Sequence, residues 1–249
     1  MNHATSELLP DGPLLAYYGD DFTGSTDVME AFTLAGVPTV LFLQTPSQAW
    51  VKKFSHMKCV GLAGTSRGRS PAWMQQNLPP AFASLKAFGA PILQYKVCST
   101  FDSNPEIGSI GTAIDLGVKV MGDSWSPMVV GAPRLRRYQA FGHLFAAMGD
   151  AVHRLDRHPT MSRHPVTPMD EADLKQHLAK QTSKRIELVD LVALKQGLGQ
   201  QRLDAAMGND GPVVLLDVID EETLALAGQL VWTNRGSGLF SASSSGLAY

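Results

Sequence analysis

The sequence has little cysteine, no long apolar stretch and almost no net charge. Its two cysteines, Cys59 and Cys98, are too few for a disulfide framework and are typical of a protein in a reducing cytoplasm. No uninterrupted apolar run approaches the ~18 residues that a membrane-spanning helix needs. With 21 basic and 23 acidic residues, the formal net charge is -2, which argues against a nucleic-acid-binding surface. We therefore expect a cytoplasmic protein without a nucleic-acid or membrane partner.

Repeats, long runs of like charge and glycine-rich phosphate loops are also missing. Neither the dinucleotide-binding glycine fingerprint nor the P-loop pattern occurs. His153, His158 and His164 do not follow zinc-finger spacing or the spacing of a helical metal pair. These absences disfavour a stand-alone nucleotide-binding enzyme, and we predict no metal site.

The composition is that of a globular protein, and its apolar pattern predicts a fold class. Of 249 residues, 44% are hydrophobic and 18% are charged, which fits one large domain or two small ones. Continuous apolar runs predict buried strands at 14–18, 38–43, 59–64, 91–97, 127–131, 186–189 and 213–217. Helical patterns fall between them at 28–36, 70–89 with an interruption at Pro79-Pro80, 107–121, after Asp170 and after Asp220. This alternation predicts a three-layer α/β fold, Rossmann-like, with a mostly parallel sheet and helices on both faces.

The pattern also divides the chain. Residues 1–12 lack the features of a signal peptide and are expected to form a disordered tail. Residues 13–240 are predicted to be the α/β domain, and 132–169 an irregular excursion rich in arginine, histidine and proline. Residues 241–249 are interpreted as a loop entering a helix, at the junction to a further domain that this chain lacks.

Polar residues follow three of the predicted strands, where each strand ends. They are 20–25 after the first strand, 64–70 after the third and 96–103 after the fourth. Because open parallel sheets bind ligands at the carboxyl ends of their strands, we expect these three segments to converge on one site.

The first segment combines two carboxylates with the start of a helix. Backbone amides near Thr23, Gly24 and Ser25 would attract a carboxylate or a phosphate. Asp20 and Asp21 could accept hydrogen bonds from a sugar hydroxyl, or its proton. The alternative is that one aspartate only caps the helix while the other is solvated.

The segment after the fourth strand offers a cation, Lys96, and several hydroxyls, including Ser99 and Thr100. Lys96 could neutralise the carboxylate or phosphate of a ligand. The alternative is a surface lysine before a turn rich in serine and threonine. Cys98 is interpreted as buried filling, because no adjacent base is evident that would activate its thiol.

Two later segments carry weaker signals. The arginines at 134–137 could clamp a carboxylate with paired hydrogen bonds, and His164 is interpreted as a hydrogen-bonding loop residue. The run Ser243-Ser244-Ser245-Gly246 could form an anion-binding nest. A flexible serine-rich linker is the alternative for this run.

Three ordered motifs together resemble a known family. They are Gly19-Asp20-Asp21-Phe22-Thr23-Gly24-Ser25, Lys96-Val97-Cys98-Ser99-Thr100-Phe101-Asp102-Ser103 and His164-Pro165-Val166-Thr167-Pro168-Met169. From Leu14 to Gly246 the chain resembles the N-terminal, substrate-binding half of the four-carbon acid sugar kinases, in particular the 3-oxo-tetronate kinase branch. It departs from that family at Gly108-Ser109-Ile110-Gly111, where Gly-Asn-Ile-Gly is usual, and at Arg136-Arg137, where Gly-Arg is usual.

The resemblance implies ATP-dependent phosphorylation of a hydroxyl on a four-carbon sugar acid of the 3-oxo-tetronate, threonate or erythronate type. The implied catalytic residues, which would orient the hydroxyls and supply a base, are Asp20 and Asp21. The implied substrate-binding residues are Thr23, Gly24, Ser25, Lys96, Ser99, Thr100, Arg137 and His164. The residues implied to face the incoming phosphate are Ser244, Ser245 and Gly246. ATP and Mg would be bound by a second domain, in cis or in another chain, and a homodimer is a further expectation. The alternative function is a non-catalytic sugar-acid-binding protein.

Overall fold

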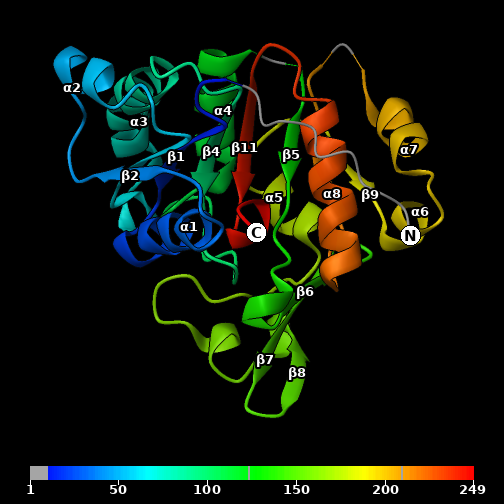
Figure 1. Ribbon diagram of the computed structural model, residues 1–249. Coiled ribbons are helices and arrows are strands. Elements are labelled where there is room, and N and C mark those ends of the chain that lie inside the picture. The colour runs from blue at the N-terminus through cyan, green and yellow to red at the C-terminus, as the bar shows by residue number, and fades with distance from the viewer. Residues whose placement is uncertain (1–10, 123, 209) are drawn as a thin grey trace.

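The computed structural model describes residues 11–122, 124–208 and 210–249, so most of the predicted tail at 1–12 lies outside the described residues. Its central layer is built from two parallel sheets (Figure 1). The larger has the order β11-β4-β1-β3-β2, formed by β1 (Leu15–Gly19), β2 (Thr39–Phe42), β3 (Cys59–Ala63), β4 (Ile92–Lys96) and β11 (Leu239–Ser243). The smaller has the order β5-β10-β9, formed by β5 (Ser126–Met128), β9 (Ile186–Val189) and β10 (Val213–Leu216).

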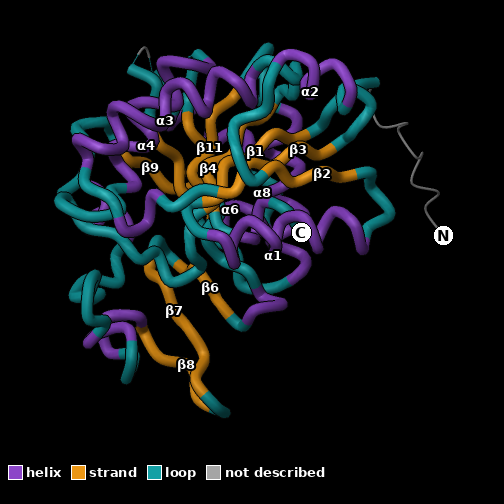
Figure 2. The backbone as a smooth tube through the Cα atoms, turned by 90° about the vertical axis from the view of Figure 1, so that its left-hand side faces the viewer, coloured by secondary structure: helices purple, strands orange, loops and turns teal. Residues whose placement is uncertain are grey.

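Helices cover both faces of this layer, as Figure 2 shows for α3 and α4 on one side and α1 on the other. They are α1 (Phe22–Leu34), α2 (Gln48–Lys53), α3 (Pro71–Lys86), α4 (Ile110–Met121), α5 (Leu174–Ala179), α6 (Leu191–Lys195), α7 (Gly199–Ala206) and α8 (Glu221–Thr233). Alternate residues of the buried strands enter two separate cores: Ala16 and Tyr18 pack with α3 and α4, whereas Leu15 and Tyr17 pack with α1 and α8. The predicted three-layer α/β fold is confirmed. Within the described ranges, no helix has both the length and the apolar character needed to cross a membrane.

Helix α3 runs through Pro79 and Pro80, so the predicted interruption is wrong. Proline removes the hydrogen bond to the carbonyl four residues earlier, and those residues, Gln75 and Gln76, are exposed to water. The apolar face of the helix continues on both sides of the prolines, with Met74, Leu78, Ala81, Phe82 and Leu85 buried. Burial of this face therefore outweighs the lost bonds.

The C-terminal segment departs most from expectation. Residues 239–243 form the buried strand β11 beside β4, not a loop, so the sheet extends past the expected domain boundary at residue 240. Strand β11, red in Figure 1, also lies beside β5, and serine hydroxyls bridge the two sheets there. The Oγ of Ser126 donates to the carbonyl of Phe240, and the Oγ of Ser241 donates to the carbonyl of Pro127, both at 2.8 Å. The two sheets thus form one continuous layer.

The excursion at 132–169 contains an antiparallel sheet that the sequence did not predict. It is formed by β6 (Arg137–Ala140), β7 (His143–Met148) and β8 (Ala151–Arg154), and it projects from one end of the molecule (Figure 1). The following helix, α5, is capped by Asp173, which accepts hydrogen bonds from the amides of Lys175 and Gln176, and not by Asp170 as expected. The predicted cap of α8 by Asp220 is confirmed.

Candidate functional site

A polar pocket lies at the carboxyl ends of β1, β3 and β4. We define the polar pocket by its lining residues: Asp21, Thr23, Gly24, Thr26, Asp27, Glu30, Arg67, Lys96, Cys98, Ser99, Leu135 and Ser245. These residues come from the start and body of α1, from the segment after β3, from the end of β4 and the segment after it, from the turn after β11, and, for Leu135, from the excursion. The three strand-end segments that the sequence singled out therefore do meet at one place.

The start of α1 forms one wall of the polar pocket. Asp21 caps the helix, because its Oδ1 accepts a hydrogen bond of 2.7 Å from the amide of Gly24. Ser25 turns inward, is fully buried and donates to the carbonyl of Asp21 at 2.6 Å. A Cβ on Gly19 would lie 1.9 Å from the Ser25 Oγ, so the strand must end in glycine for the helix to start this close.

Arg67, in the segment after β3, binds both aspartates of the first turn. Its Nε and Nη2 donate to the two carboxylate oxygens of Asp20 at 3.1 and 2.7 Å, and its Nη1 donates to Oδ2 of Asp21 at 2.8 Å. Asp20 is only 3% exposed; this burial raises the pKa of its carboxyl, and the paired contact with Arg67 opposes the shift. Arg67 belonged to a predicted segment but was not singled out by the sequence.

Lys96, at the end of β4, forms the second cationic group of the polar pocket. It is 2% exposed, its Nζ donates to the carbonyl of Val97 at 3.1 Å, and it lies 3.5 Å from Oδ2 of Asp27. Buried charge is costly unless it is paired, so the Asp27 carboxylate is what makes this burial tolerable. Sequence reasoning missed Asp27, although Thr23, Asp27 and Glu30 are four and three residues apart and so share one helix face.

The C-terminal segment holds Asp27 from the other side. The hydroxyl of Ser245 donates to Oδ2 of Asp27, and the hydroxyl of Tyr249 donates to Oδ1 at 2.9 Å. Burial, and secondarily the contact with Asp27, raises the pKa of Tyr249, so its hydroxyl stays a donor at neutral pH. The Tyr249 ring also lies 5.1 Å from the guanidinium of Arg134. The end of the described chain is thereby tied directly to the polar pocket.

Gly24 leaves the space that these charged groups surround. A Cβ at this position would lie 2.7 Å from Oδ1 of Asp21, 3.2 Å from Nζ of Lys96 and 3.7 Å from Nη2 of Arg67. Two cations therefore face the point that the missing side chain leaves open, beside the Asp21 oxygen that accepts from the Gly24 amide. The two cations are groups with which an anionic oxygen can pair.

The segment after β4 is shaped by a strained residue. Phe101 is fully buried with a φ of 60°, a conformation that a non-glycine residue rarely adopts. This turn leaves Ser99 on the wall of the polar pocket, whereas Thr100 is buried and donates to Asp102 at 2.7 Å. Cys98 also reaches the wall, but burial, followed by the nearby Asp102, raises the pKa of its thiol. A protonated thiol is a weak nucleophile, but Cys98 is half-buried on the wall of the polar pocket, so its interpretation as buried filling is wrong.

Not every residue expected at the site lies on the wall of the polar pocket. Asp20, Ser25 and Thr100 are buried behind it, and Ser244 and Gly246 are buried beside β5, where Ser244 donates to the carbonyl of Val130. Arg137 donates to the carbonyls of Leu135 and Arg136 in the excursion, and His164 accepts hydrogen bonds from Thr167. The structure therefore gathers Asp21, Thr23, Gly24, Lys96, Ser99 and Ser245 of the expected set, and adds Arg67 and Asp27.

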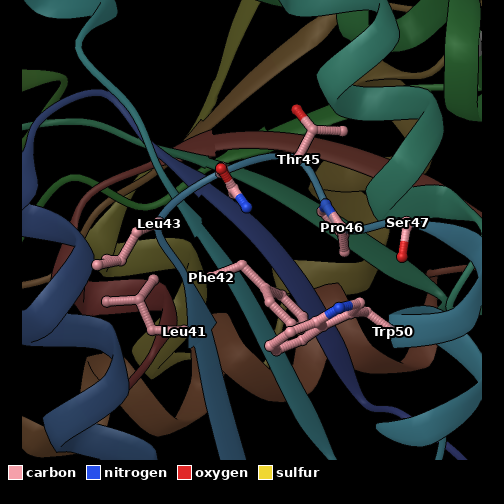
Figure 3. Close-up of a pocket in the computed structure, with 8 residues that line it drawn as sticks. Leu41, Phe42, Leu43, Thr45, Pro46, Ser47 and Trp50 are labelled. Atoms are coloured by element: carbon pink, nitrogen blue, oxygen red, sulfur yellow. The ribbon is translucent and has the colours of Figure 1, made fainter.

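A second hollow, beside edge strand β2, provides a contrast (Figure 3). It is lined by Leu41, Phe42, Leu43, Gln44, Thr45, Pro46, Ser47 and Trp50, none of which is charged. The Trp50 ring lies edge-on to Phe42 at 5.8 Å. Such a lining lacks the convergent charged groups of the polar pocket. Among the residues that the structure describes, no group of three or more histidine, cysteine or carboxylate side chains could hold a metal ion.

The fold agrees with what comparison with known proteins shows. Residues 15–249 match the family model described as a sugar-binding N-terminal domain, so the chain belongs to that family. It is 64% identical over 248 residues to the 3-oxo-isoapionate kinase of Paraburkholderia graminis, covering 100% of this chain and 53% of that protein. It is 29% identical over 233 residues to the 3-oxo-tetronate kinase of Burkholderia multivorans, covering 91% and 52% respectively. The chain thus spans about half the length of the curated relatives that it matches.

Solved structures share the fold. A candidate tRNA synthase of Salmonella typhimurium LT2 superposes with a TM-score of 0.82 at 25% identity, covering 95% of this chain and 54% of that one. A Bordetella bronchiseptica protein, solved with bound citrate as a domain-swapped dimer, superposes with a TM-score of 0.72 at 21% identity, covering 95% and 56%. The resemblance to sugar-acid kinases is confirmed at the level of the family.

Proposed function

We propose that this chain is the sugar-acid-binding half of an ATP-dependent kinase. The observation that carries the proposal is the space above Gly24, which Arg67, Lys96 and the amino end of α1 surround. A carboxylate there would lie beside two cationic side chains, with which it can form charge-assisted hydrogen bonds. Carboxylate side chains on the same wall offer acceptors for hydroxyls, so the polar pocket suits a small hydroxylated acid.

The relatives suggest which acid to test first. Because identity to the 3-oxo-isoapionate kinase is 64% and identity to the 3-oxo-tetronate kinase is 29%, we propose 3-oxo-isoapionate before 3-oxo-tetronate, threonate or erythronate. Of the residues implied to bind substrate, Thr23, Gly24, Lys96 and Ser99 are retained in this proposal, because they line the polar pocket. Arg137 and His164 are not, because their hydrogen bonds lie within the excursion.

Phosphoryl transfer also needs ATP and Mg, and the described residues do not fit them. No strand in the described ranges leads into a glycine-rich phosphate loop, and no cluster of three metal-ligating side chains is found there. We therefore assign no reaction step to either group in this chain. A second domain, in cis or in another chain, is proposed to supply them, and a homodimer and a cytoplasmic location stay predictions.

Calorimetry with the full 249-residue chain tests the proposal. We expect 3-oxo-isoapionate, or the more stable threonate, to bind with one-to-one stoichiometry and to weaken as salt is added, because two cations hold the carboxylate. Adding the ATP-binding half of a relative with Mg-ATP should then produce ADP. Failure of every sugar acid to bind would contradict the proposal. Binding without ADP formation under these conditions would favour the non-catalytic sugar-acid-binding protein instead.

A further inference from the structure

We infer that Asp27, rather than the Asp20–Asp21 pair, accepts the hydrogen bond of a substrate hydroxyl, and that Asp27 and Lys96 together select hydroxy acids over plain carboxylic acids. This inference rests on the proposed sugar-acid site and assigns its selectivity to a residue pair that the motifs did not single out.

The motif aspartates are already occupied by protein donors. Both carboxylate oxygens of Asp20 accept from Arg67, and Asp20 is only 3% exposed. Asp21 accepts from the amide of Gly24 with one oxygen and from Arg67 with the other. A ligand hydroxyl would have to compete with a guanidinium and a helix amide, which are strong, fixed donors. The pair is therefore better suited to holding Arg67 in place than to contacting the ligand.

Asp27 has partners that a ligand can replace more easily. It lies on the wall of the polar pocket, and its side chain is 22% exposed. Its hydrogen-bond donors are two neutral hydroxyls, those of Ser245 and Tyr249. Hydroxyls rotate freely and can donate to water or to the ligand when displaced. A sugar hydroxyl can thus replace the hydroxyl of Ser245 or of Tyr249 as a donor to Asp27, and the carboxylate keeps the same number of hydrogen bonds.

The spacing of charge in the polar pocket defines the class of ligand. Nζ of Lys96 and Oδ2 of Asp27 are 3.5 Å apart, so a cation and an acceptor stand side by side. A molecule whose carboxylate neighbours a hydroxyl satisfies both at once: the carboxylate meets Lys96, and the hydroxyl donates to Asp27. A carboxylate without hydroxyls would place its charge beside Asp27 with no proton to share, and like charges repel. Asp27 therefore lowers the affinity for acids without hydroxyls and raises the affinity for hydroxy acids.

Calorimetry with three matched probes tests this assignment on the full chain. Erythronate carries the charge and the hydroxyls, butyrate carries only the charge, and erythritol carries only the hydroxyls. We expect the wild-type chain to prefer erythronate to both by tenfold or more. In Asp27→Asn, erythronate should bind at least tenfold more weakly and butyrate severalfold more tightly, because Lys96 is no longer neutralised. In Lys96→Met, the preference for erythronate over erythritol should fall at least tenfold, because only Arg67 is left to pair with the carboxylate. The control, Asp170→Asn, removes one negative charge from an exposed residue outside the polar pocket and should change none of the three.

The outcomes separate the two proposals. If no sugar acid binds the wild-type chain, the proposed function fails and this inference fails with it. If erythronate binds and Asp27→Asn keeps the wild-type preference over butyrate, the inference is wrong while the proposed function stands. Should Asp27→Asn or Lys96→Met fail to fold, as judged by thermal unfolding, Tyr249→Phe gives a second test. It removes a competing donor from Asp27, so the preference for erythronate over butyrate should rise, and an unchanged or smaller preference would overturn the assignment.

Discussion

Two aspartates occupy equivalent places in the two parallel sheets, yet their surroundings differ. Asp20 directly follows β1, Asp217 directly follows β10, and both are buried. Burial raises the pKa of each carboxyl. Asp20 is held by one side chain, Arg67, on the border of the polar pocket. Asp217 is held by three backbone amides and by the side chain of Gln139.

Asp217 joins the excursion to the α/β layer. Its carboxylate accepts from the amides of Phe141, Gly142 and Leu191 and from the side chain of Gln139. Phe141 and Gly142 form the turn between β6 and β7, and both have a positive φ. A strand-end aspartate is therefore not by itself a sign of function. What distinguishes the two is that a cationic side chain holds Asp20, whereas neutral donors, mostly main-chain amides, hold Asp217.

The largest expected effect is on stability, at Asp217. Asp217→Ala leaves the buried amide of Gly142 and the half-buried hydrogen-bonding amides of Phe141 and Leu191 without their acceptor, and each buried group left unpaired costs about 1–3 kcal/mol. We expect the free energy of unfolding to fall by about 3–5 kcal/mol, measured by urea denaturation. As a control, Asp210→Ala removes an exposed partner of Arg185 and should have an effect below about 1 kcal/mol. A loss of that small size at Asp217 would mean that the excursion is not anchored there.

The second prediction concerns Asp20, whose buried carboxylate depends on a single side chain, Arg67, for its hydrogen bonds. Arg67→Met leaves the Asp20 carboxylate buried without its partner, for which we expect a loss of about 3 kcal/mol. Adding Asp20→Asn removes the buried charge and should restore part of the stability, whereas sugar-acid binding should stay lost in the double variant. Urea denaturation and calorimetry measure the two effects separately. If the double variant were no more stable than Arg67→Met alone, Arg67 would not act mainly by neutralising Asp20.

Gly24→Ala should separate ligand binding from stability. The added methyl group would lie 3.2 Å from Nζ of Lys96 and fill the space proposed for the carboxylate. Alanine favours a helix over glycine by about 1 kcal/mol, although contact with Asp21 at 2.7 Å offsets part of this gain. We expect a melting temperature within a few degrees of wild type and at least a tenfold loss of threonate affinity. Gly228→Ala, in α8, where nothing lies within 4 Å of the added atom, is the control. Threonate binding that survives in Gly24→Ala would place the carboxylate elsewhere.

The sequence predicted the fold and the meeting of three strand ends because both follow from local patterns. Continuous apolar runs and helix caps are visible one segment at a time, and the carboxyl ends of parallel strands must share an edge. Strand β11 was missed because its serines are typical of a linker. Their role becomes evident only beside β5, where Ser241 of β11 and Ser126 of β5 each donate a hydrogen bond across the boundary between the two sheets.

The part of the candidate site that was predicted from the sequence also follows from local patterns. Asp21, Gly24 and Lys96 lie at strand ends or a helix start, where the sequence alone indicates a ligand. The pairing of Arg67 with the two aspartates joins residues 46 and 47 positions apart, and the contact of Asp27 with Ser245 spans 218. Such contacts depend on the order of strands in the sheet, which a single sequence does not contain.

The smallest expected effect is a pH dependence that arises behind the polar pocket. His177, in α5, is buried; its Nε2 lies 3.1 Å from the hydroxyl of Ser103, and its Nδ1 has no hydrogen-bond partner among the residues that the structure describes. Burial, and secondarily the positive charge of Lys180, lowers the pKa of His177 in the folded chain. In the unfolded chain this histidine has an ordinary pKa of about 6.5. Between that pH and the lower folded pKa, the unfolded chain therefore binds more protons than the folded chain does. The contribution of neutral His177 to the free energy of unfolding is therefore fully present above about pH 6.5. It is lost as the pH falls toward the folded pKa.

Comparison of wild type with His177→Gln isolates that contribution, because glutamine can still contact Ser103 but does not titrate. We expect the free energy of unfolding of the wild type to fall between pH 7 and pH 5 more steeply than that of the variant, by at most about 1.4 kcal/mol per pH unit. Burial also lowers the pKa of His158, which is present in both proteins, so part of the slope should remain in the variant. Equal slopes in the two proteins would show that His177 accepts a proton as readily in the folded chain as in the unfolded one. The segment after β4 would then be open to water from behind, and its Ser99 would not be held rigidly against the polar pocket.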